Sequence, residues 1–161
     1  MNRVFKSLTN RQKVDLIPYI QKYLSEHTET EIFIGCDSQN HRSSTSYATV
    51  IVLHNKGRGG HVLYTQEETP RVRMGRQTAK TEVEFQRLWS EVERSIEVAE
   101  HLKLNDIKKP TFIDIDLNPD PQFKSNQALR AALGYVESMG YIVRCKPEAV
   151  SATYVADKIC K

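Results

Sequence analysis

The stretch IFIGCDSQN, residues 32–40, has the pattern of a buried strand that ends in an acid. Its β-branched and aromatic residues are typical of a strand, and the polar run from Ser38 indicates where that strand ends. A second stretch of the same kind, TFIDIDL at residues 111–117, is followed by the turn-forming NPDP at residues 118–121. Both stretches carry acids, and an ion inside a protein is costly unless something compensates its charge. We therefore expect these acids to have partners or a function.

The alternation of side chains along a strand places the acids of each stretch on one face. Asp37 shares its face with Phe33 and Gly35, and Asp114 and Asp116 share a face in the second stretch. If the two strands are parallel neighbours, Asp37 and Asp114 lie close enough for like-charge repulsion to raise a pKa, unless a divalent cation binds between them. Mg²⁺ or Mn²⁺ suits a site made only of oxygen ligands.

These acids also have simpler explanations. Asp37 could cap a loop, and Asp114 could form a salt bridge, without any metal. Asp114, Asp116, Asn118 and Asp120 match the first four odd-numbered ligand positions of a calcium-binding loop. That interpretation fails because Pro119 stands where such a loop needs glycine and Ser125 stands where it needs a glutamate.

The rest of the chain predicts an α/β protein. Three strand patterns come first, with a glycine-rich turn between the second and third, and strand and helix patterns then alternate to the end. We expect a mixed five-stranded sheet in the order β-β-β-α-β-α-β-α with helices on both faces. A single domain should cover residues 1–161, with an N-terminal helical extension at about residues 8–26. The predicted elements are strands at 31–37, 47–54, 61–65, 111–117 and 141–145, and helices at 79–101, from 122 or 125 to 139, and after Pro147.

Composition fits one soluble globular domain of 161 residues, with 23 Lys+Arg against 20 Asp+Glu and a net charge of +3. No apolar run approaches the roughly 20 residues that span a bilayer, and the N-terminus lacks the apolar stretch of a secretory signal. Cys36, Cys145 and Cys160 form no CxxC pair, so we expect reduced thiols rather than disulfides or a cysteine-based zinc site. These features predict a cytoplasmic protein without a membrane partner.

Several short motifs are similar to those of a known family. They are IGCDSQ at residues 34–39, FIDID at 112–116, ESMG at 137–140, KPEA at 146–149 and ADK at 156–158. Through them the sequence, from about residue 32 to 158, resembles the ribonuclease H-like superfamily and, within it, the bacterial YkuK-like proteins.

The resemblance implies a two-metal nucleic-acid hydrolase, with acids from the first strand, the first long helix, the fourth strand and the last helix. Asp37 and Asp114 match the strand acids, and Asp157 matches the acid of the last helix. For the long helix we choose Glu91 over Glu84. Glu91 flanks the apolar stripe and has a small residue one turn later, so it has room to lean toward the sheet.

Two further residues are candidates for contact with metal. Asp116 shares the face of Asp114, and Glu84 is the second choice on the long helix. The chain departs from typical ribonuclease H enzymes, since Ser38 follows the first Asp and neither a separate basic protrusion nor a catalytic histidine loop is recognisable. The resemblance therefore implies nuclease chemistry with Mg²⁺ or Mn²⁺ without indicating an RNA–DNA hybrid as substrate.

Basic residues supply candidate phosphate contacts. Arg71, Arg73, Arg76 and Lys80 cluster before the long helix, and Lys124 lies where the next helix is expected to open. A solvated loop would also explain the cluster. We expect a divalent-metal-dependent nuclease acting on RNA or DNA. The alternative is a catalytically inactive ribonuclease H-like module that binds nucleic acid or serves as a scaffold.

Overall fold

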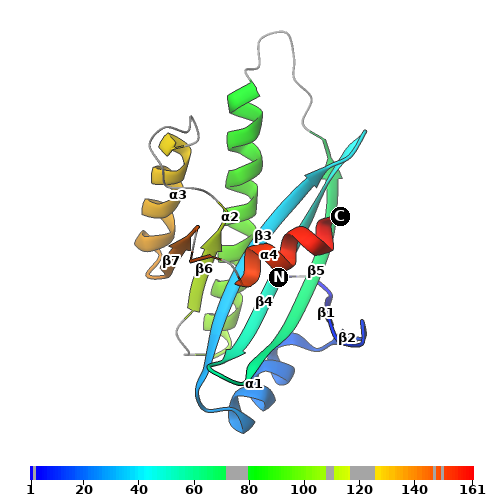
Figure 1. Cartoon of the computed structure of the whole chain (residues 1–161), viewed down its shortest axis with the longest axis vertical. Helices are drawn as coiled ribbons and strands as arrows, with labels where there is room; N and C mark the ends of the chain where they lie inside the picture. The colour runs from blue at the N-terminus through cyan, green and yellow to red at the C-terminus, as the bar shows by residue number, and fades with distance from the viewer. Residues whose placement is uncertain (2, 72–79, 108–110, 117–125, 147, 150) are drawn as a thin grey trace.

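A seven-stranded mixed sheet forms the centre of the molecule (Figure 1). The computed structural model describes residues 1, 3–71, 80–107, 111–116, 126–146, 148–149 and 151–161. The strands are β1 (Phe5–Ser7), β2 (Lys13–Val14), β3 (Thr30–Asn40), β4 (Ser44–Asn55), β5 (Gly59–Pro70), β6 (Thr111–Ile115) and β7 (Ile142–Cys145). The helices are α1 (Leu16–Glu26), α2 (Lys80–Leu104), α3 (Asn126–Ser138) and α4 (Ser151–Cys160). The strands lie in the order β2-β1-β5-β4-β3-β6-β7.

The middle of the sheet combines a long antiparallel meander with a parallel half. β3, β4 and β5 pair antiparallel along almost their whole length. Gly57 and Gly59 turn the chain from β4 into β5 with φ of 74° and 82°, a conformation that side chains other than glycine rarely adopt. β6 then pairs parallel to β3, and β7 parallel to β6. Such parallel pairs require crossovers, which α2 and α3 supply.

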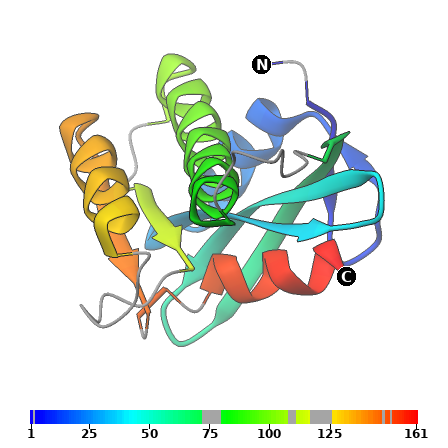
Figure 2. The ribbon, with the colours of Figure 1, turned by 90° about the horizontal axis from the view of Figure 1, so that it is seen from above.

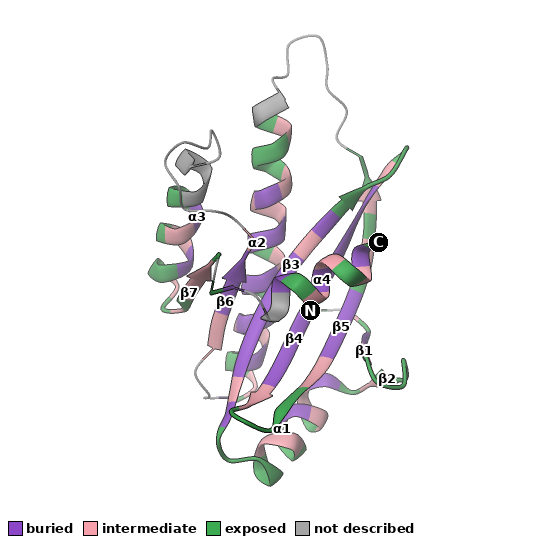
Figure 3. Cartoon of the chain, viewed as in Figure 1, coloured by how far each residue is buried: buried purple, intermediate pink, exposed green. Residues whose placement is uncertain are grey.

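Helices cover both faces of the sheet, as predicted, and each face has its own apolar core (Figure 2). Ile32, Ile34 and Ile51 point to the face that α1, α2 and α3 cover. Phe33 and Val50 point to the opposite face, where α4 packs. The period-two alternation of β3 therefore divides its apolar residues between two cores, and Figure 3 shows that β3 and β4 are buried along most of their length.

The sheet is larger than the predicted one. The five expected strands are β3 to β7, in the expected chain order, and β1 and β2 add two more at the edge of β5. The helix expected at about residues 8–26 begins only at Leu16, because the residues before it form this strand pair. Strands of 3 and 2 residues are too short to show an alternation, although Phe5 is fully buried.

Among the described residues, no helix is both long and apolar enough to span a membrane.

Candidate active site

The two acidic strands, β3 and β6, are parallel neighbours, which is the condition for their acids to lie close together. In the β3–β6 pair, Gly35 lies opposite Asp114. Asp37 follows Gly35 by two residues along β3. Asp116 follows Asp114 by two residues and lies just past the end of β6. The register therefore sets Asp37 level with Asp116 rather than with Asp114.

The carboxylate of Asp114 is bound to an arginine from the next strand. Arg144, which lies opposite Asp114 in the β6–β7 pair, donates from Nε to Oδ1 at 2.8 Å and from Nη2 to Oδ2 at 2.9 Å. The side chains are 0% exposed for Asp114 and 20% exposed for Arg144. The guanidinium also lies 3.9 Å from the centre of the Phe33 ring. Asp114 therefore forms a salt bridge, as its simpler explanation suggested. Burial is the main reason that the pKa of Cys145 is raised, and the charge of Asp114 raises it further.

Glu91 points from α2 toward the end of β3. It is only 9% exposed, and Ser38 Oγ donates to its Oε1 at 2.5 Å. Burial is the main reason that the pKa of Glu91 is raised to about 7, and the nearby charges of Asp37 and Asp116 raise it further. The hydrogen bond from Ser38 and the charge of Arg87 oppose this rise in pKa. A buried glutamate beside two other acids is an uncommon arrangement that a purely structural role would not require.

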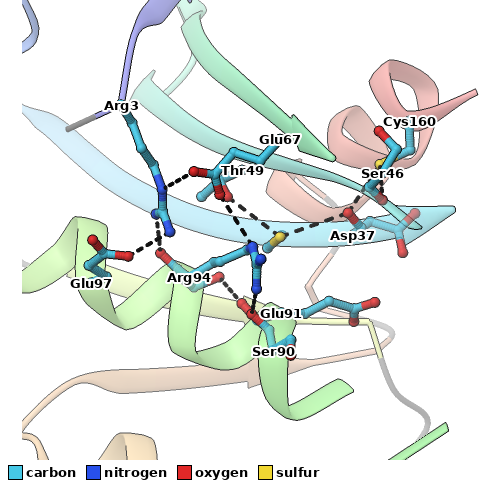
Figure 4. Close-up of polar contacts among 12 residues, drawn as sticks. Arg3, Asp37, Ser46, Thr49, Glu67, Ser90, Glu91, Arg94, Glu97 and Cys160 are labelled. Atoms are coloured by element: carbon cyan, nitrogen blue, oxygen red, sulfur yellow. Dashed lines mark hydrogen bonds and ion pairs between the residues drawn. The ribbon is translucent and has the colours of Figure 1, made fainter. Parts of the chain in front are cut away.

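Asp37 lies at the centre of the acid group. Burial is the main reason that the pKa of Asp37 is raised, and the charges of Asp116 and Asp157 raise it further. The backbone N–H of Ser38 lowers it by hydrogen bonding. Cys160 Sγ lies 3.0 Å from the carbonyl oxygen of Asp37, which ties the last residues of α4 to the end of β3 (Figure 4).

Four acids, each from a different part of the chain, therefore lie near the end of β3: the charges of Asp116 and Asp157 act on Asp37, and those of Asp37 and Asp116 act on Glu91. They come from β3, α2, the residue after β6, and α4. Of the acids predicted for the site, the structure groups these four, while Asp114 on the same strand face is paired with Arg144. We call this group the acid cluster.

The other predicted site residues are exposed or lie outside the described residues. Glu84 is on the same helix as Glu91 and is exposed. Arg71 is exposed after the end of β5 and donates from Nη1 to the carbonyl oxygen of His41 at 3.0 Å. The following predictions lie outside the described residues: Arg73, Arg76, Lys124 and the side chain of Lys80.

Two lysines neutralise part of the acid cluster. Lys146 Nζ lies 2.5 Å from Asp116 Oδ1, and Lys161 Nζ lies 2.7 Å from Asp157 Oδ2. Both lysine side chains are more than half exposed, at 54% and 62%. Exposed pairs of this kind are weak, so both ammonium groups can leave at low cost.

The acid cluster fits Mg²⁺ or Mn²⁺ in its chemistry. Its side-chain donors are carboxylate oxygens, the ligands that these hard cations prefer. Within the described part of the chain, no three acid, histidine or cysteine side chains are already close enough to hold an ion. The arrangement thus supplies oxygen donors and negative charge of the kind that these cations need.

A network of ion pairs holds α2 in place beside the acid cluster (Figure 4). Arg3 Nε lies 3.0 Å from Glu67 Oε1, and Arg3 Nη2 lies 2.5 Å from Glu97 Oε2. Arg94 Nε lies 3.3 Å from the other oxygen of Glu67, and its guanidinium is 3.9 Å from the centre of the Tyr47 ring. These contacts join the N-terminal segment, β4, β5 and α2, and so orient the helix that carries the buried glutamate.

Three residues around the acids were not expected from the sequence. Ser38 was noted only as a departure from the family pattern, yet it contacts Glu91. Arg87 approaches the same strand end, with Nη1 3.5 Å from the carbonyl oxygen of Ser38. Arg144 carried a usable signal, since a charged residue inside a short, otherwise apolar strand points to an oppositely charged neighbour.

A mixed sheet with acids gathered at the ends of two parallel strands, and with further acids from two packed helices, is a nuclease-like architecture. The sequence model described as "Ribonuclease H-like" matches residues 15–161, and the chain belongs to this family. The match agrees with the resemblance seen in the short motifs. A search of curated proteins found no match.

Proposed function

We propose that this protein is a divalent-metal-dependent phosphodiesterase that hydrolyses nucleic acid. The observation that carries the proposal is the acid cluster itself, in which four elements direct carboxylates to the ends of β3 and β6. The membership of the ribonuclease H-like family supports the same chemistry. Clustered like charges destabilise a fold, so a protein that gathers them needs a compensating cation or a function for them.

Asp116, rather than Asp114, is the strand acid that we assign to the metal site. The bidentate pair with Arg144 occupies both oxygens of Asp114. Asp116 instead faces an exposed lysine that can move away. Asp37 and Asp116 would anchor the metal ions, and Glu91 and Asp157 would complete the ligand set.

Bound Mg²⁺ or Mn²⁺ supplies an activated water and stabilises the leaving oxygen during phosphodiester hydrolysis. The residues of the chain prepare this site in three ways. Ser38 fixes the orientation of Glu91 by its hydrogen bond. Glu91, whose pKa is about 7, must release its proton before it can act as a ligand, so metal affinity should rise with pH near neutrality. Lys146 and Lys161 pair with Asp116 and Asp157, and these two carboxylates would exchange the lysines for the cations.

The test compares cleavage by matched variants. Wild-type protein is assayed with Mg²⁺, Mn²⁺ and Ca²⁺ on single-stranded RNA, single-stranded DNA, duplexes, hybrids and branched junctions. Asp37→Asn and Asp116→Asn should abolish cleavage, whereas Glu82→Gln, an exposed change on the same helix as Glu91, should leave it unchanged. Ca²⁺ should support binding but poor chemistry, because its larger and looser coordination misplaces the water.

Two outcomes would contradict the proposal. Cleavage that persists in Asp116→Asn would place the chemistry elsewhere or in a contaminant. Metal binding in calorimetry with no cleavage of any substrate would favour the catalytically inactive nucleic-acid-binding module.

A further inference from the structure

A pocket of about 320 Å³ lies next to the acid cluster. The ends of β3 and β4, including Asn40 and Tyr47, form one wall, and the first half of α2, including Phe85 and Trp89, forms the other. Arg87 also lines it. This volume is at the lower end of small-ligand pockets, which are about 300–1,000 Å³, and suits one flat ring system.

Two contacts connect the pocket to the acids. Arg87 Nη1 approaches the carbonyl oxygen of Ser38, and Ser38 Oγ donates to Glu91. Ser90, the neighbour of Glu91 in the chain, lines the pocket as well. A ligand in the pocket would therefore lie within a short distance of the place where the proposed chemistry occurs.

The α2 wall carries a series of stacked aromatic rings. The Phe85 and Trp89 ring centroids are 5.9 Å apart with planes inclined by 14°, and Trp89 also stacks on Tyr135 of α3 at 5.2 Å and 27°. The indole N–H of Trp89 donates to Glu93, which fixes the ring. Phe85, one turn earlier on the helix, is 40% exposed although it is large and apolar. Its ring gives a flat ligand a surface on which to continue the stack.

The surroundings of the pocket favour a negatively charged ligand backbone. Among the described residues that line the pocket, Arg87 is charged and none is acidic. The turn that joins β3 to β4, next to Asn40, carries the exposed Arg42. Arg71 is attached to the same turn through the carbonyl oxygens of His41 and Ser43. Cations beside a stacking surface are the combination with which proteins bind single strands.

The geometry points to a binding site for one unpaired base of single-stranded nucleic acid, stacked on Phe85, with its flanking phosphates at Arg87 and the β3–β4 turn. This inference rests on the proposed function, because the base would belong to the strand whose phosphodiester bond reaches the acid cluster. A base in a duplex is stacked on its neighbours and cannot enter the pocket. Single-stranded RNA and DNA share the chemistry that the pocket recognises.

The chain contains one tryptophan, so Trp89 reports on its own pocket. Intrinsic fluorescence is followed while short single-stranded RNA or DNA is added in EDTA, where no metal-dependent cleavage occurs. Parallel titrations use a duplex of the same sequence and an abasic strand of the same length. Single strands of RNA, of DNA or of both should quench the emission in a saturable way, while the duplex and the abasic strand should quench it little.

Variants separate stacking from charge. Phe85→Ala should weaken single-strand binding by about 5- to 150-fold, the loss expected for one base–aromatic stack. Phe85→Tyr should bind as the wild type does, and Tyr154→Ala, which removes a similarly exposed ring on α4, should change nothing. Circular dichroism confirms that each variant is folded, and Phe85→Leu, which keeps the apolar contact without the aromatic face, serves if the alanine variant is unfolded.

The two proposals can fail separately. Equal quenching by the abasic strand or the duplex, or unchanged affinity in Phe85→Ala and Phe85→Leu, overturns the base pocket, even if metal-dependent cleavage is observed. Phe85-dependent quenching with no cleavage in Mg²⁺ supports the base pocket and contradicts the nuclease. Failure of every nucleic acid to quench, with quenching by a peptide instead, would make the pocket a protein-binding site and overturn this inference.

Discussion

Replacing Arg144 by methionine should destabilise the protein far more than loss of a surface ion pair. Asp114 has a fully buried side chain and accepts two hydrogen bonds from this arginine. Removing one partner of a buried ion pair typically costs about 3–5 kcal/mol, because the remaining charge cannot reach water. Methionine can still lie against the Phe33 ring, so most of the loss comes from the charge rather than from packing.

A second variant shows whether the charge is responsible. In the double variant Asp114→Leu/Arg144→Met, both members of the pair become apolar at similar volume, and such replacements are often neutral or stabilising. We therefore expect the free energy of unfolding of the double variant to lie within about 1 kcal/mol of the wild-type value. It should be well above that of Arg144→Met alone.

The neighbouring pair at the end of the same strand is the matched control. Lys146 and Asp116 are 54% and 28% exposed, so Lys146→Met should cost no more than about 1 kcal/mol. The free energy of unfolding of each variant is measured by urea denaturation followed by circular dichroism, with a check that the dependence on urea concentration is unchanged.

A small loss in Arg144→Met, comparable to that of Lys146→Met, would refute the reasoning. Asp114 would then not depend on its arginine, and its assignment as a structural rather than a metal-binding acid would be wrong. The assignment of Asp114 would also be wrong if millimolar Mg²⁺ raised the free energy of unfolding of Arg144→Met by more than it raises that of the wild type.

Two further predictions concern the groups around Asp37. The pKa of Glu91 is raised from 4.5 to about 7 on folding, so the metal-free native state binds more protons than the unfolded state in that range, and stability should fall by up to about 3 kcal/mol as pH rises through it. Urea unfolding in EDTA at several pH values should show this slope in the wild type and lose it in Glu91→Gln; equal slopes would contradict the assignment. Burial, with the charge of Asp37, raises the pKa of Cys160 to about 12, and burial raises the pKa of Cys36 well above its usual value. Both thiols should react slowly with a disulfide reagent at pH 8, and Cys160 faster in Asp37→Asn; rapid labelling of the folded wild type would disagree with this.

Most of the sheet could be predicted because its strands have strong local patterns. The stretch at residues 32–40 shows β-branched and aromatic residues, and the structure makes it part of the interior strand β3, which lies between β4 and β6. The long apolar stripe predicted at residues 79–101 forms α2, and Glu91, which flanks that stripe, turns toward the sheet and contacts Ser38 of β3. Local periodicity is a reliable signal for elements of this length.

The assignment of the second strand acid could not be made in the same way. Asp114 and Asp116 share a face, so alternation alone does not distinguish them. The register of β6 against β3, and the partner that β7 brings to Asp114, decide which acid is paired and which faces Asp37. Register depends on contacts between segments far apart in the chain, which no local pattern contains.

The strand pair before α1 has a practical consequence for the boundaries of this protein. The family match begins at residue 15, whereas β1 and β2 lie before it and pair with β5. A chain trimmed to the matched region would lose the buried Phe5 and leave the backbone of β5 open along part of its length. An uncovered strand edge of this kind is a template for pairing with another chain. The limits of sequence similarity are therefore narrower than the limits of the folded sheet, because the first fourteen residues supply the two strands that cover part of the β5 edge.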